Sequence, residues 1–158
     1  MIEIAIKDRA WTRALPNARA LTGRAARACL ARFALGGGVS ILLASDQAVG
    51  ELNHRFRSKA GPTNVLAFPA TGNCGGGLGD IALAFGVCVR EAAEQGKPLA
   101  DHMQHLVIHG ALHLIGYDHQ TRGEAETMEM IERQILAGLG LGDPYADGEG
   151  RTADVQTA

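Results

Sequence analysis

The sequence lacks three features that would place the protein in a membrane or outside the cell. The 158-residue chain has no run of about 18 apolar residues, which excludes a membrane-spanning helix. Residues 1–6 alternate as a β-strand does, without the basic and then apolar pattern of a signal peptide. The three cysteines form no C-x-x-C pair, which is typical of reduced thiols. We therefore expect a cytoplasmic protein without membrane partners.

The chain also lacks internal repeats and any sign of a second domain. Its length suits one ordinary domain, and its 46% apolar and 20% charged residues are normal for a globular protein. We assign residues 1–145 to a single domain. Residues 146–158 contain almost nothing apolar and are predicted to be a disordered tail.

Hydrophobic periodicity predicts strands and helices that do not alternate strictly, which is typical of an α+β fold. We expect a small mixed four-stranded sheet packed with about five helices, with the histidine-bearing helix at the centre. The glycine-rich loop 72–79 has no Gly-Lys-Ser/Thr signature, so we interpret it as the connection of a hairpin and not as a phosphate cradle. The expected strands are 2–6, 39–44, 64–69 and 81–85, and the expected helices are 17–35, 47–57, 86–95, 99–115 and 124–137.

The last of these helices is expected to be amphipathic. Its inward face is assigned to apolar residues at helical spacing, namely Ala125, Met128, Ile131 and Ile135.

Histidines recur at metal-ligand spacing near the end of the expected helix 99–115. His109 and His113 are four residues apart and therefore share one helix face. Gly116 can end the helix in the left-handed conformation, so that the chain returns His119 as a third ligand. The spacing is that of the metzincin zinc helix. Catalytic zinc typically takes three protein ligands and one water, so we predict one Zn²⁺ per chain on these three histidines.

Two further histidines precede this set. His105 also lies four residues before His109, but it is ~12 Å along the helix axis from His113, so the three cannot share one ion. Only the pair formed by His109 and His113 lies next to the turn that delivers His119. We therefore interpret His105 as a packing or supporting residue and His102 as exposed or supporting, while His54 is expected at the surface.

The fourth coordination position is predicted to be open. Cys74 or Cys88 could close it, but neither has a spacing that predicts this. Asp118, next to His119, could orient a ligand imidazole or form a hydrogen bond within the turn, and the sequence leaves both alternatives open. Where a metzincin has its catalytic Glu, this chain has Gly110, which removes the base that a peptidase uses to activate water.

A cationic cluster follows the expected helix 47–57. Arg55, Arg57 and Lys59 could simply be solvated, but an arginine can also bind a phosphate through two hydrogen bonds and stabilise developing charge. Zinc, a water and an arginine would together form a phosphodiesterase site. Residues 1–60 carry ten Lys and Arg against four Asp and Glu, whereas the rest of the chain carries five against thirteen.

Residues 109–119, His-Gly-Ala-Leu-His-Leu-Ile-Gly-Tyr-Asp-His, resemble the signature of the YbeY family of bacterial endoribonucleases. Segments within 52–69, 78–81, 124–129 and 139–145 resemble the family as well. The resemblance implies zinc binding by His109, His113 and His119 and places the family's active-site arginine at Arg57. It further implies cleavage of single-stranded RNA, in maturation of the small-subunit ribosomal RNA end and in ribosome quality control.

These implications define the expected chemistry and its alternatives. Catalysis is assigned to Arg57 and the three histidines, with Asp118 and Asp80 as candidate bases and the RNA 2′-hydroxyl as an alternative nucleophile. The expected partners are single-stranded RNA, ribosomal RNA, the small ribosomal subunit and ribosome-associated proteins, because the acidic overall charge favours guidance by partners. The alternatives are a metzincin-like metallopeptidase and a non-catalytic, zinc-stabilised ribosome-associated factor.

Overall fold

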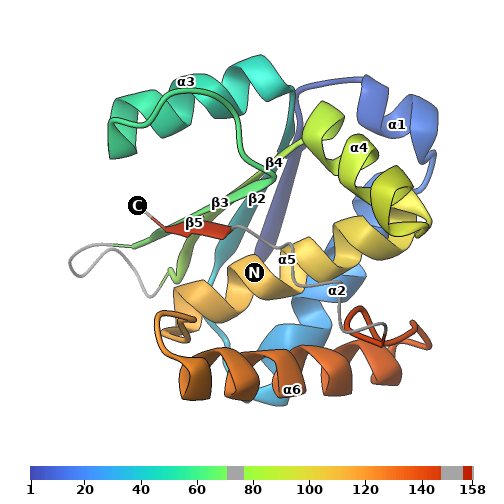
Figure 1. Ribbon diagram of the computed structural model, residues 1–158, viewed down its shortest axis with the longest axis vertical. Coiled ribbons are helices and arrows are strands. Elements are labelled where there is room, and N and C mark those ends of the chain that lie inside the picture. The colour runs from blue at the N-terminus through green and yellow to red at the C-terminus, as the bar shows by residue number, and fades with distance from the viewer. Residues whose placement is uncertain (71–76, 147–154, 158) are drawn as a thin grey trace.

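The computed structural model describes residues 1–70, 77–146 and 155–157, and it confirms the α+β class (Figure 1). All four expected strands and all five expected helices are present, with small shifts of their ends. In chain order the elements are β1 (Ile2–Ile6), α1 (Ala10–Ala14), α2 (Ala18–Arg32), β2 (Val39–Ala44), α3 (Asp46–Arg57), β3 (Val65–Pro69), β4 (Gly79–Ala84), α4 (Phe85–Gln95), α5 (Leu99–Ile115), α6 (Arg122–Gly138) and β5 (Val155–Thr157).

The sheet is mixed, with the strand order β1-β2-β4-β3-β5. β1, β2 and β4 are parallel, so that Ile4, Ile41 and Ile81 lie side by side across the sheet. β3 runs antiparallel to β4, which confirms the predicted hairpin. The short strand β5 extends the sheet beyond the four expected strands by pairing with β3 in parallel.

The strand β5 and the helix α1 correct the sequence predictions. β5 comes from the segment predicted to be disordered, so that prediction does not hold for residues 155–157, while 147–154 and 158 lie outside the described residues. α1 lies in what was expected to be a plain connection. It forms because Asp8 accepts a hydrogen bond from the Ala10 backbone N–H, and because the buried Trp11 donates its indole N–H to the carbonyl of Ala44.

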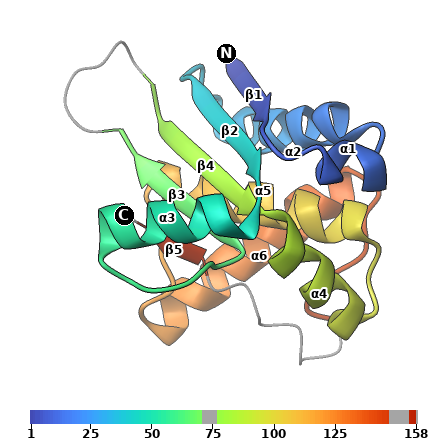
Figure 2. The same cartoon turned by 90° about the horizontal axis from the view of Figure 1, so that it is seen from above.

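The two faces of the sheet are covered by different helices (Figures 1 and 2). Alternate strand residues such as Leu43, Ile81 and Leu83 join the main core with α2, α5 and α6. The residues between them, including Ala82 and Leu66, pack instead against α3. The period-two alternation of each strand therefore puts α5 and α3 on opposite faces.

Helix α5 is the most deeply buried element, as the sequence predicts. Every residue from His102 to Leu114 is buried. Gly110 faces the sheet, because a Cβ added there would lie 3.1 Å from the Cγ2 of Ile81 on β4. A larger residue at this position would crowd the Ile81 side chain, so the glycine in place of the metzincin Glu has a packing reason. No helix among the described residues has the length and apolar character needed to cross a bilayer.

Candidate metal centre

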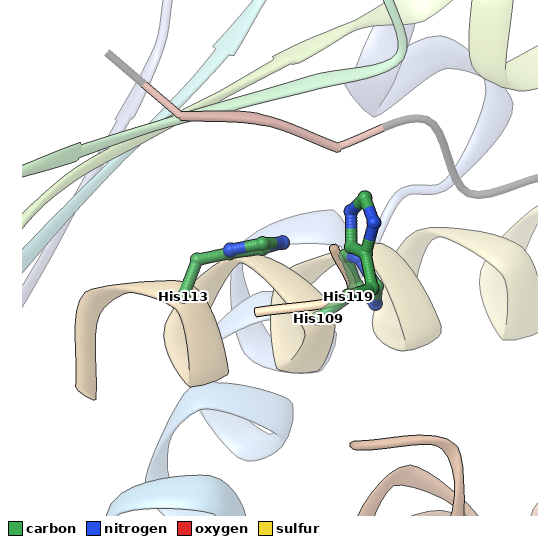
Figure 3. A group of neighbouring side chains, drawn as sticks. All are labelled: His109, His113 and His119. Atoms are coloured by element: carbon green, nitrogen blue, oxygen red, sulfur yellow. The ribbon is translucent and has the colours of Figure 1, made fainter. Parts of the chain in front are cut away.

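The structure brings the three predicted ligands together at the C-terminal end of α5 (Figure 3). The rings of His109 and His113 have centroids 5.0 Å apart, as expected for residues one turn apart on a helix. Gly116 ends the helix with a φ of 119°, a conformation that glycine adopts without steric cost. The chain then returns the ring of His119 to 5.7 Å from His109 and 5.2 Å from His113. One ligand nitrogen from each lies within 4.8 Å of the others.

These residues fit a metal ion by the chemistry of their nitrogens. His109 directs Nδ1 to Glu132, and its buried Nε2 has no hydrogen-bond partner among the described residues. Burial lowers the pKa of His109, and burial together with His109 and His119 lowers the pKa of His113 to about 4. Both imidazoles are therefore neutral at pH 7, which is the form that binds metal.

The group offers an open side. His109 and His113 are buried, whereas His119 is exposed, and within the described residues this group has three members. Cys88 is buried elsewhere, where its Sγ lies 3.8 Å from the carbonyl oxygen of Asn64. Cys74 lies outside the described residues. Three nitrogen ligands with solvent access are typical of a catalytic zinc site and not of a closed structural one.

A buried carboxylate behind His109 was missed by the sequence analysis. Glu132, on α6, is fully buried and accepts hydrogen bonds from three side chains. Its Oε2 is bonded to Nδ1 of His109, and its Oε1 is bonded to the Tyr145 hydroxyl and to Nε2 of His105, 3.1 Å away. Burial opposes ionisation, but His109 and His105 outweigh it and hold the pKa of Glu132 well below its usual range. Burial and this carboxylate raise the pKa of Tyr145, which stays a hydrogen-bond donor.

The remaining polar candidates take different places. His102 is buried and not exposed, with its Nε2 2.9 Å from a carboxylate oxygen of Glu91. Asp118 accepts a hydrogen bond of 2.7 Å from the His119 backbone N–H, so of the two alternatives it adopts the bond within the turn. His54 is exposed on α3, as expected.

Arg57 is the last residue of α3, which packs on the face of the sheet opposite α5 (Figure 1). Beside it, Phe56 has 58% of its surface exposed, and its ring lies 5.6 Å from that of Phe68. The guanidinium of Arg55 lies 5.6 Å from the Phe56 ring. The structure thus places Arg57 on a different helix from the histidines, and its catalytic role stays a prediction.

The sequence matches the family described as Endoribonuclease YbeY over residues 5–140. The chain belongs to the YbeY family. Among its YbeY relatives, the Endoribonuclease YbeY of Maricaulis maris is 48% identical over 145 residues, covering 91% of each chain. That of Paramagnetospirillum magneticum is 48% identical over 159 residues, covering 92% of this chain and 97% of the relative. The predicted resemblance to the YbeY family is therefore confirmed.

A solved structure supports the fold. The solution structure of a Thermotoga maritima protein aligns with a TM-score of 0.55 at 23% identity, covering 98% of this chain and 97% of that one. At this level of identity the likeness concerns the fold alone.

Proposed function

We propose that this protein is a zinc-dependent, single-strand-specific endoribonuclease that acts in maturation of the small-subunit ribosomal RNA end and in ribosome quality control. One observation carries the proposal: His109, His113 and His119 bring their nitrogens within 4.8 Å in a chain of the YbeY family. The relatives are named endoribonucleases, which gives RNA as the substrate class. The protein then works in the cytoplasm with single-stranded ribosomal RNA, the small subunit and ribosome-associated proteins.

The residues of the proposed site have separate roles. A bound Zn²⁺ would supply a Lewis acid and an activated water. His109, His113 and His119 would hold the ion, and His119, the exposed member of the three, lies where RNA can approach. Arg57 binds the phosphate and offsets the negative charge that develops on it.

The general base and the nucleophile each have more than one candidate. Asp118 already accepts the His119 N–H, and Asp80 lies on β4, where it is exposed. Glu132 is fully buried behind His109, so it does not reach the RNA. The nucleophile is either the water activated by zinc or the RNA 2′-hydroxyl, and a 2′,3′-cyclic phosphate on the product would identify the 2′-hydroxyl.

The peptidase alternative is weakened by packing as well as by sequence. The position of the metzincin base is Gly110, where an added Cβ would crowd the buried Ile81. No carboxylate is therefore available there to activate a water for peptide hydrolysis.

The test compares metal-free and zinc-loaded protein on end-labelled RNA. We expect cleavage of a single-stranded oligonucleotide only with zinc, much slower cleavage of the matching duplex, and no cleavage of a peptide library. Cleavage that survives complete metal removal would contradict the proposal. Unfolding on metal removal, with no RNA cleavage by the zinc-loaded protein, would instead favour the non-catalytic zinc-stabilised factor.

A further inference from the structure

We propose that Glu132 is a positioning residue of the metal centre: it holds His109 in the tautomer that presents Nε2 to the ion, and His105 and Tyr145 lock its carboxylate in place. This inference rests on the proposed metal centre and adds to it a residue from another helix. It concerns how the buried ligand is prepared before metal or RNA arrives.

The orientation of the His109 ring determines which of its nitrogens carries the proton. A neutral imidazole has one N–H and one bare nitrogen, and the partner of one nitrogen decides which is which. Nδ1 of His109 is bonded to Oε2 of Glu132, and a carboxylate only accepts hydrogen bonds. The proton therefore stays on Nδ1, and Nε2 is left bare on the side of His113 and His119. A carboxylate in this position also makes the ligand nitrogen more basic.

The carboxylate of Glu132 is itself fixed. Its Oε1 accepts from the Tyr145 hydroxyl and lies 3.1 Å from Nε2 of His105, so both oxygens are occupied. Tyr145 is held in turn, because its backbone N–H is bonded to Asp143 at 2.8 Å and the Arg133 guanidinium lies 5.2 Å from its ring. The carboxylate cannot rotate away from His109 without breaking these contacts.

The same side chains could be mistaken for a second metal site. His105, His109 and Glu132 also offer ligand atoms within 4.8 Å of one another. However, the Tyr145 hydroxyl donates a hydrogen bond to Oε1 of Glu132 and also lies 3.1 Å from Nε2 of His105. The atoms that face each other are already hydrogen-bonded, so the group needs no ion. Nε2 of His109, in contrast, has no partner among the described residues.

A buried charge on α6 also needs an explanation that packing does not give. Glu132 lies in the apolar stripe between Ile131 and Ile135 and is fully buried. Well-packed apolar residues of similar volume are often as stable as a buried ionic group. Its proposed role in positioning the metal ligand His109 accounts for a carboxylate at this position.

The experiment uses the full chain with Glu132→Gln and Glu132→Leu. Glu126→Gln is the matched control, because it removes an exposed carboxylate from the same helix. Long-range ¹H–¹⁵N NMR of the metal-free protein reports the tautomer of His109, and competition with a chromophoric chelator reports the Kd for Zn²⁺. We expect Glu132→Leu to mix the two tautomers and weaken zinc binding about 10–100-fold, as for other partners of metal-bound histidines. Glu132→Gln, which keeps an acceptor oxygen, should lose several-fold, and the control should match the wild type.

The inference is overturned if Glu132→Leu folds with the wild-type tautomer and a zinc Kd within about twofold. If that variant does not fold, Glu132→Gln decides, and wild-type tautomer and affinity in that variant overturn the inference. Neither readout involves RNA. A wild type that binds zinc but cleaves no RNA would therefore remove the proposed function and leave the inference standing.

Discussion

The face of the sheet that packs on α5 and the face that packs on α3 present their polar groups in different ways. On the α5 face, His109 and His113 are buried, and Glu132 and its partners fix the ring of His109. On the α3 face, Phe56 is exposed beside Arg55 at the end of the helix. This face also has an open groove of about 780 Å³, lined by apolar residues such as Leu52 and Phe68 and by two acids, Glu3 and Asp80.

The difference follows from what each group has to bind. A metal ligand needs a fixed direction and a neutral nitrogen, and burial within a hydrogen-bonded network supplies both. An arginine that grips a phosphate needs reach and solvent access, and its charge does not depend on burial. The metal ligands and Arg57 come from separate helices, so metal binding and phosphate binding can be disturbed separately.

The largest expected effect comes from removing a ligand on the α5 face. His113→Ala should lower the zinc content from one per chain to background and reduce RNA cleavage by more than about 100-fold, the upper effect of losing only a supporting partner. His54→Ala, an exposed histidine on α3, is the control and should retain both. Metal analysis measures the zinc content of both variants, and cleavage of labelled RNA measures their activity. Full zinc content in His113→Ala would remove this residue from the ligand set.

Gly110→Glu tests the contact between α5 and β4. The new side chain must displace Ile81, so we expect a loss of at least ~3 kcal/mol in the free energy of unfolding, from overpacking and a buried polar group. Gly123→Glu is the control, since an added Cβ at Gly123 meets no atom within 4 Å. Urea denaturation gives the stability, and a peptide library tests for gained peptidase activity, which we expect to be absent. A stable variant that cleaves peptides would reverse the packing argument.

Arg57→Ala should separate phosphate binding from metal binding most directly. We expect cleavage to fall ~10²–10³-fold, as when one preorganised donor to a developing charge is removed. Zinc content should stay at the wild-type value, because Arg57 lies on α3 whereas the three ligands lie on α5 and in the turn that follows it. Arg57→Lys should restore little of the cleavage activity, since lysine keeps the charge but cannot bind the phosphate in a bidentate manner. Loss of zinc in Arg57→Ala would contradict the separation of phosphate binding from metal binding.

The sequence predicts the local part of the candidate site and misses the distant part. His109, His113, Gly116 and His119 lie within eleven residues, so the geometry of one helix and the turn at its end bring them together. Glu132 is 23 residues from His109 along the chain and on another helix. A signal was present, since a glutamate occupies the inward stripe that contains Met128, Ile131, Glu132, Ile135 and Leu136. The predicted inward face of this helix contained only apolar residues.

The fold shows the same division between local and distant information. Strand and helix positions follow from periodicity, and the β3–β4 hairpin joins neighbours in the chain. The order β1-β2-β4-β3-β5 depends on pairings between distant segments, which periodicity does not encode. The helix α1 has only five residues, too few to show a helical pattern. It depends on a contact between Trp11 and Ala44, 33 residues apart.

The smallest expected effect compares two helix caps of similar chemistry on the two faces. Ser45 accepts the Ala48 N–H at the start of α3, and Thr121 accepts the Glu124 N–H at the start of α6, each at 3.1 Å. Replacing either by Ala should cost ~1 kcal/mol in the free energy of unfolding. Thr121 lies two residues after His119, so fraying there also loosens a metal ligand.

Only Thr121→Ala should therefore weaken zinc binding, by no more than about fivefold, the factor that ~1 kcal/mol represents. Urea denaturation measures the free energy of unfolding of both variants, and chelator competition measures their affinity for zinc. Equal zinc affinity in the two variants would show that His119 is held independently of the cap of α6. A loss confined to Ser45→Ala would mean that the metal centre depends on the α3 face, against the separation argued from Arg57.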